Sequence, residues 1–308
     1  MAGRFEFLPL RFQFQACDPV VFPPGESGNI LRGAFGTIFR KLVCDPRCHD
    51  AKTCPVRDRC PYARVFEPRS AVGGPSGLAD WPRPFVFRAH HLDGRRIAPG
   101  KTFHFDLHMF AVREPWLAYF VESFARLARE GLGPGRGRAV LGRGERLDLE
   151  GRPSGLLRET AAPLVLDLSA DPPPVSRILV RFTTPTELKS GSSLASQPEF
   201  DILFARIRDR LSTLGALYGA GPLEIDFKEL GRQASQVCMV RSNVRHVASK
   251  RRSSKTGQVH PTGGFVGEAE YQGDIAEFMP FLRAARWTGV GRQTVWGKGA
   301  LEITALEP

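Results

Sequence analysis

The pattern of hydrophobic and polar positions changes its period along the chain, and each change marks an expected element. Near the N-terminus the period is close to two, which predicts a half-buried strand with apolar positions at Phe5, Phe7, Leu10, Phe12 and Phe14. Residues 28–43 instead follow helical spacing, with apolar side chains at Leu31, Phe35, Ile38 and Leu42. We then expect strands at 84–88, 101–112 and 140–149, and a second helix at 116–131.

The same order of elements is expected again after a proline-rich segment. Residues 171–174, Asp-Pro-Pro-Pro, are predicted to form a stiff linker between a domain at 1–170 and a domain at 175–308, because proline fixes φ. The strands expected in the second domain lie at 178–183, 223–229, 236–247, 264–271 and 300–306. Its helices are expected at 196–218 and 274–287, with Pro280 disturbing the second of them.

Apart from the additional strand expected at 223–229, each half has the order strand, helix, two strands, helix, strand. That order is typical of the split βαβ or ferredoxin-like fold. The predicted fold class is α+β, with two tandem ferredoxin-like (RRM-like, βαββαβ) domains and an inserted cysteine-rich loop at 44–60. The two halves share this order of elements but no convincing residue-level repeat.

Composition fits a globular protein with a core, because 42% of the 308 residues are hydrophobic and 24% are charged. No window reaches the ~18 consecutive apolar residues that a membrane span needs. The N-terminus also lacks the apolar stretch of a signal peptide. We therefore expect a cytoplasmic protein with no membrane partner; the sequence does not indicate its oligomeric state.

The formal net charge of +11 favours an anionic partner such as nucleic acid or a membrane surface, with a basic enzyme of scattered arginines as the alternative. The excess is concentrated in three segments. Residues 230–267 carry +7, residues 28–64 carry +5 and residues 126–146 carry +4. We expect these three segments to contact the anionic partner.

Four of the six cysteines are clustered with the spacing C-x3-C-x5-C-x5-C. Four thiolates that close together can form a tetrahedron around zinc, and a reducing compartment favours metal over disulfides. We predict a structural zinc site on Cys44, Cys48, Cys54 and Cys60. Free thiols and an iron–sulfur cluster are the alternatives, and His49 could replace one ligand.

The other two cysteines, Cys17 and Cys238, lie in strand contexts far from this cluster. Free cysteine commonly behaves as a small hydrophobic residue. We therefore expect both side chains to be buried.

A glycine-rich segment at 289–299 has the sequence GVGRQTVWGKG. A dinucleotide-binding fingerprint would need a strand before it and a helix after it, whereas here a helix precedes and a strand follows. We instead predict a loop that brings backbone N–H groups, Arg292 and Lys298 to phosphates, with a plain turn as the alternative.

The stretch 241–255, RSNVRHVASKRRSSK, is strongly basic and belongs to the same half of the chain. A solvated basic hairpin would explain it. The sharper hypothesis is a hairpin that binds phosphates, which would give salt-dependent affinity without sequence readout.

Several of these segments together resemble Cas6, the CRISPR precursor-RNA endoribonuclease of the RAMP superfamily. In the second half the similar stretch is GGFVGEAEYQGDIAEFMPFLRAARWTGVGRQTVWGKGALEI. In the first half the similar segments are GNILRGAFGTIFRKLVC, RCPYARVFEP and PRPFVFR. The glycine-rich loop is typical of RAMP proteins in general, and the combination of LRGAFG with Y-x-GD narrows the resemblance to Cas6-like members.

The resemblance implies a prokaryotic protein with two ferredoxin-like domains that bind CRISPR repeat RNA across them. It also implies cleavage without a catalytic metal, in which a 2′-hydroxyl attacks the adjacent phosphate and leaves a 2′,3′-cyclic phosphate and a 5′-hydroxyl. Such chemistry needs a base, an acid and cations that stabilise the phosphorane charge. Histidine suits the first two roles because its pKa lies near neutrality.

Cas6 enzymes often place a catalytic histidine on or just after the first helix, and the helix expected here has none. Our candidates for general base or acid are therefore His246 first, then His260 and His49, with Lys41 as a charge stabiliser. The residues predicted to bind RNA are Arg32, Arg40, Lys41, Arg241, Arg245, Lys250, Arg251, Arg252, Lys255, Gly289, Gly291, Arg292, Gly297, Lys298 and Gly299.

Two other functions stay open at this point. A RAMP subunit that holds crRNA in a CRISPR effector complex, beside other Cas subunits, would share the binding residues and cut nothing. A zinc-containing DNA-binding protein is a weaker alternative, because the cysteine loop is short and no basic recognition helix follows it.

Overall fold

The structure is a computed structural model that describes residues 3–45, 47–48, 50–51, 53–68, 81–158, 161–169, 171–248, 250–252, 259–261 and 263–306, with the backbone alone at 250–252 and 259–261. The chain forms two units. The N-terminal unit comprises Glu6–Leu164 and Leu217–Gly219, and the C-terminal unit comprises Met1–Phe5, Val165–Ala216 and Ala220–Pro308. The units thus divide at 164/165, whereas the sequence predicts domains at 1–170 and 175–308.

The N-terminal sheet is built from antiparallel strands that pair in the order β3-β5-β1-β6-β7, and β8 also pairs with β1. The helices of this unit's βαββαβ order are α1 (Ser27–Val43) and α3 (Leu117–Glu130). The strands are β1 (Arg4–Ala16), β3 (Phe85–Arg88), β5 (Thr102–Met109), β6 (Ala139–Leu147), β7 (Pro153–Leu156) and β8 (Leu164–Asp167).

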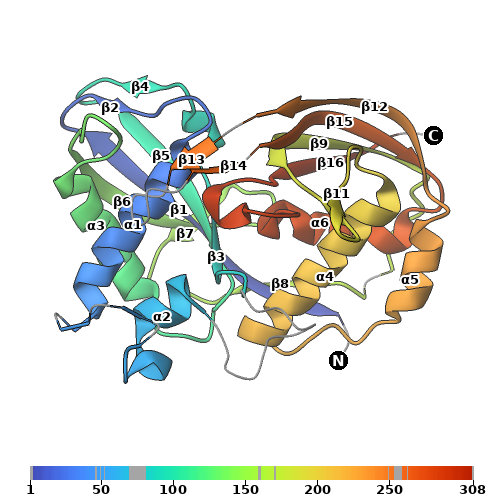
Figure 1. The fold of residues 1–308 in the computed structure, drawn as a ribbon, viewed down its shortest axis with the longest axis horizontal. Helices are drawn as coiled ribbons and strands as arrows, with labels where there is room; N and C mark the ends of the chain where they lie inside the picture. The colour runs from blue at the N-terminus through green and yellow to red at the C-terminus, as the bar shows by residue number, and fades with distance from the viewer. Residues whose placement is uncertain are drawn as a thin grey trace. The chain divides into compact units, whose positions relative to one another are not determined.

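The C-terminal sheet has four strands in the order β12-β15-β9-β16, all paired antiparallel. They are β9 (Arg177–Thr186), β12 (Cys238–Val247), β15 (Gly264–Gln272) and β16 (Leu301–Ala305), with the helices α4 (Phe200–Tyr218) and α6 (Met279–Thr288). Figure 1 shows the four strands side by side, with α4 and α6 on one face.

When only the four strands of the βαββαβ order are counted in each unit, both sheets have the strand order 2-3-1-4, which is the ferredoxin-like arrangement; β7 and β8 extend the N-terminal sheet. In both units the first strand is central, and its first connection is a helix. The predicted fold class of two tandem ferredoxin-like domains is confirmed.

Short elements complete the description. In the N-terminal unit they are β2 (Val20–Val21), α2 (Pro61–Phe66), β4 (Arg96–Ile97) and the 3-10 turns η1 (Arg57–Arg59) and η3 (His90–Leu92). In the C-terminal unit they are β10 (Lys189–Ser190), β11 (Ser193–Leu194), α5 (Phe227–Ala234), β13 (Lys250–Arg252), β14 (Val259–Pro261), η4 (Ala276–Phe278) and η5 (Thr294–Trp296). No helix within the described ranges is both long and apolar enough to cross a membrane.

The strand predicted at 223–229 is wrong. A helix, α5, begins at Phe227 instead, because the Asp226 carboxylate accepts hydrogen bonds from the backbone N–H groups of Lys228 and Glu229 and so caps the helix. The alternation that suggested a strand is interrupted by this capping residue.

Pro280 does not disturb the last helix. It lies in the first turn of α6, where the ring occupies a position that needs no intrahelical N–H donor. The expected burial of Cys17 and Cys238 is also wrong, since both are exposed. Cys17 follows the end of β1, and Cys238 opens the edge strand β12, where one side has no neighbouring strand.

The core of the N-terminal unit is rich in phenylalanine. The side chain of Phe35, on α1, is fully buried. Its ring centre lies 4.8 Å from that of Phe120 and 4.9 Å from that of Phe124, both on α3, and 5.6 Å from that of Phe85 on β3. One side chain thus joins both helices of the unit to the sheet.

We therefore expect Phe35→Ala to lower the free energy of unfolding of the N-terminal unit by about 3–5 kcal/mol, because it leaves a cavity among aromatic rings. Phe35→Leu, which refills most of the volume, should lower it by less than half as much. Urea unfolding followed by circular dichroism and tryptophan fluorescence measures both changes. Equal effects of the two variants would contradict the packing described here.

Candidate nucleic-acid interface

The basic side chains of α1 are used in packing within the N-terminal unit. The Arg40 guanidinium donates to the backbone oxygen of Cys48 over 3.0 Å and lies 5.7 Å from the ring centre of Tyr62. Arg32 lies 5.5 Å from the ring centre of Phe66. Lys41 forms an ion pair with Glu130 at 3.3 Å. Both partners of that pair are solvent-exposed, so it holds Lys41 only weakly.

In the C-terminal unit, the alternation of side chains along β12 divides the predicted basic hairpin between two faces of the sheet. Arg241 pairs in register with Glu270 and Arg245 with Val266, on the outer face, whereas His246 pairs with Phe265 on the helix-covered face. Arg245 and His246 therefore point in opposite directions although they are neighbours in sequence.

His246 is exposed, and its ring packs edge-on against Phe265, with 6.1 Å between ring centres. Its Nε2 lies 3.2 Å from the backbone oxygen of Ser196. A carbonyl oxygen only accepts hydrogen bonds, so this contact requires a proton on Nε2. The neutral ring then has Nδ1 as an acceptor, which is the form a general base needs.

The glycine-rich loop is held tightly at the end of β9. The backbone N–H of Gly299 donates to the oxygen of Pro185 over 3.1 Å, and that of Val290 donates to the oxygen of Gly299 over 2.9 Å. Gly299 has φ +67, and a Cβ there would overlap the carbonyl oxygen of Val290. Gly291 has φ +76, and a Cβ there would overlap the carbonyl oxygen of Glu187. These two glycines are needed for close backbone approach.

The two basic side chains of this loop, Arg292 and Lys298, differ in solvent exposure. Arg292 donates from its backbone N–H to the oxygen of Glu187 over 3.1 Å, and its guanidinium pairs with the Glu187 carboxylate at 3.2 Å. Lys298 is almost completely buried, with 7% of its surface exposed. A phosphate at this loop would therefore meet Arg292 first, in competition with Glu187.

Strand register brings His246 and the loop to the same end of the C-terminal sheet. His246 is opposite Phe265 on β15, and Phe265 is opposite Thr186 on β9. Thr186 directly precedes Glu187, which pairs with Arg292. The backbones of His246 and Thr186 are therefore two strand spacings apart, roughly 10 Å. The hairpin of β13 and β14 follows β12 at this end, with Arg251 opposite His260 in register.

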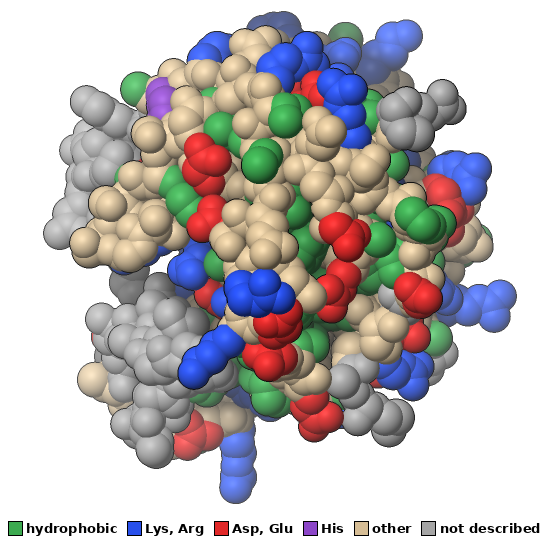
Figure 2. Space-filling view, turned by 90° about the vertical axis from the view of Figure 1, so that its right-hand side faces the viewer, with side chains coloured by type: hydrophobic (Ala, Val, Ile, Leu, Met, Phe, Trp, Pro, Cys, Tyr) green, Lys and Arg blue, Asp and Glu red, His purple; other side chains and the backbone are tan. Residues whose placement is uncertain are grey.

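The outer face of the C-terminal sheet is not uniformly basic. Arg181 pairs with Glu268 at 2.8 Å and with Glu302 at 3.7 Å, and Arg241 pairs with Glu270 at 3.3 Å. Figure 2 likewise shows acidic and basic side chains interspersed over one face of the molecule. Arg241, one of the basic residues of 230–267, is therefore paired with an acidic side chain of β15, which the linear count could not show.

Some predicted site residues are outside the described part of the chain. His49 and Lys255 are not described at all, and the side chains of Lys250, Arg251, Arg252 and His260 are not described. In the third basic segment, Arg138 pairs with Asp18 at 2.7 Å and Arg143 with Glu145 at 3.3 Å. The roles in RNA binding predicted for these site residues and for the segment 126–146 stay predictions.

Two family models match the chain. Residues 5–164, more than half of it, match AF_1859_N, which is described as an N-terminal domain. Residues 180–301, which contain the loop and His246, match the CRISPR-associated endoribonuclease Cas6. The chain therefore belongs to the AF_1859_N domain family, and its C-terminal region is similar to Cas6. No curated protein sequence matches this Cas6-like protein.

Solved structures share its fold at low sequence identity. A Cas6 product complex is 18% identical, with a TM-score of 0.55, and the match covers 97% of this chain and 99% of that chain. Cas6 of Thermus thermophilus is 16% identical, with a TM-score of 0.52 and coverage of 97% and 98%. A partial Cas6-RT-Cas1–Cas2 complex is 11% identical, with a TM-score of 0.58, covering 98% of this chain and 46% of that one.

The Cas6-like protein has a polar cluster on its N-terminal sheet that the sequence signals only weakly. The rings of His91 and His104 stack with 4.5 Å between centres, and His91 Nε2 lies 2.9 Å from the His104 backbone oxygen. Beside them Arg11 forms a bidentate ion pair with Asp106, with N···O distances of 2.7 and 2.9 Å. Burial, with nearby Arg11, lowers the pKa of His104, which favours the neutral form of this ring.

Strand alternation alone could have placed Arg11 and His104 on the polar faces of their strands. The sequence does not show that β1 and β5 are neighbours, and pairing is what brings Arg11 opposite Asp106 and Gln13 opposite His104. The polar cluster is therefore a product of the tertiary structure.

The four clustered cysteines of the Cas6-like protein come together in pairs. Burial, together with the adjacent Cys60, raises the pKa of the Cys44 thiol to about 12. Desolvation and a hydrogen bond with Cys54 raise the pKa of Cys48. Among the residues described, no group of three or more His, Cys, Asp or Glu side chains could hold a metal ion. The zinc site stays a prediction from the sequence.

That prediction has a direct test. If zinc is bound, elemental analysis of the purified protein should give about one zinc per chain, and Cys60→Ser should lose it, because a structural site needs its full ligand set. Cys238→Ser is the matched control and should retain the metal. Metal-free protein in which all four thiols react with a thiol reagent would leave the two pairs as free cysteines.

The close packing of the glycine-rich loop gives a second expected result. Gly299→Ala should lower the free energy of unfolding by about 1–3 kcal/mol or more, since it combines a left-handed φ with overlap on Val290. Gly135→Ala, where a Cβ would meet nothing within 4 Å, should be close to neutral. Thermal unfolding measures both. Equal stability of the two variants would contradict the loop geometry.

Proposed function

We propose that this Cas6-like protein is an endoribonuclease that binds CRISPR repeat RNA and processes precursor crRNA. The observation that carries the proposal is that His246 and the glycine-rich loop lie at the same end of the sheet, in the region that matches Cas6. A proton-transfer group and a loop with a basic rim are the two parts that RNA cleavage needs in one place.

The chemistry we propose uses the RNA's own 2′-hydroxyl as nucleophile. His246 accepts the 2′-OH proton, and the 2′-oxygen forms a bond to the adjacent phosphorus. The P–O5′ bond breaks, and the leaving 5′-oxygen takes a proton from a second group, for which His260 is the next candidate. The products are a 2′,3′-cyclic phosphate and a 5′-hydroxyl, with protein side chains making both proton transfers.

Charge that builds on the phosphorane oxygens requires cations or N–H donors. Arg292 is the exposed cation of the loop, and its pairing with Glu187 fixes its position before RNA arrives. Lys41 on α1 is the corresponding candidate in the N-terminal unit, since its ion pair with Glu130 is exposed. Other Cas proteins are a second class of partner that we propose, in keeping with the composition of the Cas6-RT-Cas1–Cas2 complex.

A non-catalytic RAMP subunit that binds crRNA in an effector complex is the second candidate. One observation favours it: α1, Ser27–Val43, contains no histidine. The two functions share the binding residues and differ only in whether RNA is cut.

Cleavage of the cognate repeat RNA in the presence of EDTA separates these functions. We expect 5′-hydroxyl products, and a 2′-deoxy substitution at the scissile nucleotide should abolish cutting while binding persists. His246→Ala should lower the single-turnover rate about 10²- to 10⁴-fold, the usual contribution of a general acid or base. His90→Ala, at an exposed histidine of η3, is the matched control and should not change the rate.

Intact repeat RNA after incubation with folded, RNA-bound protein would refute the enzyme and support the binding subunit. Cutting of the 2′-deoxy substrate would refute the nucleophile. An unchanged rate in His246→Ala would move the proton transfer to His260 or His49.

A further inference from the structure

Each unit of the chain carries a glycine-rich loop at the same place in its topology. In the C-terminal unit the loop is 289–299, between α6 and β16. In the N-terminal unit it is 131–138, GLGPGRGR, between α3 and β6. Both helices end at a glycine with positive φ, Gly131 at +106 and Gly289 at +70. The two loops therefore connect the second helix to the fourth strand in the same way.

Both loops also pack against the segment that follows the first strand of their unit. The backbone N–H groups of Cys17 and Asp18, just after β1, donate to the oxygen of Arg138 over 2.8 and 3.1 Å. The Arg138 guanidinium pairs with the Asp18 carboxylate at 2.7 Å. In the C-terminal unit Arg292 makes both kinds of contact with Glu187, just after β9. The two loops thus share their contacts as well as their topology, although the halves show no residue-level repeat.

Each loop contains one non-glycine residue with a left-handed backbone. These residues, Arg136 with φ +48 and Gln293 with φ +64, are the two non-glycine residues with positive φ in the described part of the chain. A residue with a Cβ disfavours this conformation. Arg136 lies between Gly135 and Gly137, and a further glycine would form the same turn with less strain. The turn alone therefore does not account for the arginine side chain at this position.

The Arg136 guanidinium is exposed and has no acidic partner among the residues that the structure describes. It donates to the backbone oxygen of Glu130, the last residue of α3, over 3.2 Å. The Glu130 carboxylate pairs instead with the exposed ammonium of Lys41, at 3.3 Å. Two cations therefore approach the end of one helix, where a single carboxylate leaves a net positive charge.

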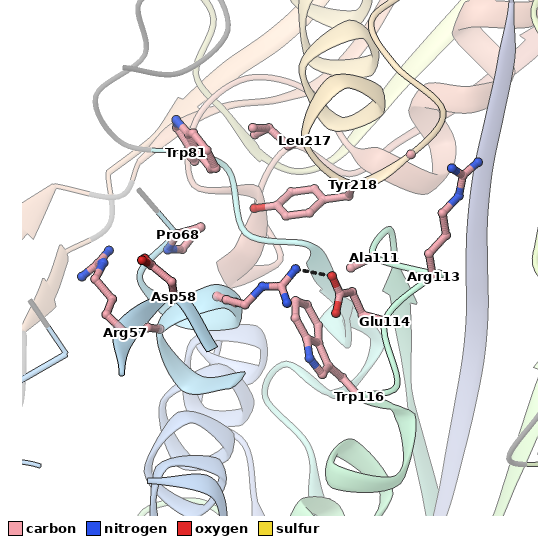
Figure 3. A pocket seen from close by; sticks show the side chains of 13 residues that line it. Arg57, Asp58, Pro68, Trp81, Ala111, Arg113, Glu114, Trp116, Leu217 and Tyr218 are labelled. Atoms are coloured by element: carbon pink, nitrogen blue, oxygen red, sulfur yellow. Dashed lines mark hydrogen bonds and ion pairs between the residues drawn. The ribbon is translucent and has the colours of Figure 1, made fainter. Parts of the chain in front are cut away.

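Other arginines of the N-terminal unit are paired with carboxylates. Arg64 and Arg113 line the pocket drawn in Figure 3. Arg64 pairs there with Glu114, and Arg113 pairs with Glu6 at 3.3 Å. An anion at either side chain would have to displace a carboxylate, whereas at Arg136 it would displace only a contact with a carbonyl oxygen.

We propose that the loop 131–138 binds a phosphate of the RNA backbone through Arg136. The planar guanidinium can donate to two phosphate oxygens at once. One exposed arginine would hold a free phosphate ion only weakly, whereas an RNA strand gains affinity from each cation that it contacts. The inference rests on the proposed function in that the ligand is RNA, and it requires neither the repeat sequence nor cleavage.

The test measures binding of a 20-nucleotide oligouridylate RNA by fluorescence anisotropy, over a range of about 50 to 200 mM KCl. Arg136→Gly removes the guanidinium and suits the left-handed φ, so the loop keeps its shape. We expect the slope of log Kd against log salt to fall by about 0.7, the value for one phosphate contact on a single strand. At the lowest salt Kd should rise about 5- to 10-fold, the factor that this slope implies.

Arg152→Gly is the matched control, because it also removes one exposed arginine of the N-terminal unit. Arg152 lies in the turn after β6, at the other end of this nine-residue strand, roughly 30 Å from the loop. It already pairs with Asp148 and Glu150. Its salt slope should equal that of the unmodified protein. Arg136→Lys keeps the charge and should keep most of the slope, and thermal unfolding should give all three variants similar midpoints.

An unchanged salt slope in Arg136→Gly overturns the inference, and so does an equal fall in Arg152→Gly, which would report net charge alone. An unmodified protein that does not bind oligouridylate also overturns it. Repeat RNA that is cut while the slope is independent of Arg136 overturns the loop site and leaves the proposed function in place. Repeat RNA that stays intact while the slope depends on Arg136 would instead overturn the endoribonuclease and leave the loop site in place.

Discussion

In each unit one central strand pairs with a neighbour on both sides, and the groups that could act on RNA are positioned from it. β9 pairs with β15 and β16, and the backbone that follows it holds the glycine-rich loop through Pro185 and Glu187. β1 pairs with β5 and β6 and brings Arg11 opposite Asp106. Because hydrogen-bond register fixes the faces and ends of neighbouring strands, residues far apart in sequence meet at defined places.

The loop that ends β9 shows how a structural requirement and a binding role share one sequence. Its glycines allow the backbone to turn with positive φ and to pass close to Val290 and Glu187. The same turn leaves Arg292 at the surface beside an acidic partner. The glycine pattern of this loop is therefore explained first by packing, and any contact with phosphate would be made by that packed loop.

Positive and negative side chains are mixed more evenly on the surface of the sheets than along the sequence. The +7 of residues 230–267 is real as a count, but β12 faces the acidic positions of β15, and Arg241 pairs with Glu270 there. Arg40 on α1 is likewise tied to the backbone of Cys48. Salt bridges and packing thus decide which basic side chains an RNA could contact without displacing an acidic partner. A linear charge count therefore overstates the basic surface.

Sequence periodicity by itself determined the order of elements in both halves, because the periods of a strand and a helix are local properties of the chain. It also placed the glycine-rich segment between the last helix and the last strand. It did not find α5, whose start depends on one capping carboxylate at Asp226. Only the tertiary structure decided that His246 and Arg245 face opposite ways and that His91 stacks on His104. Each of these depends on which strands and loops become neighbours, and that pairing is not encoded in any local pattern.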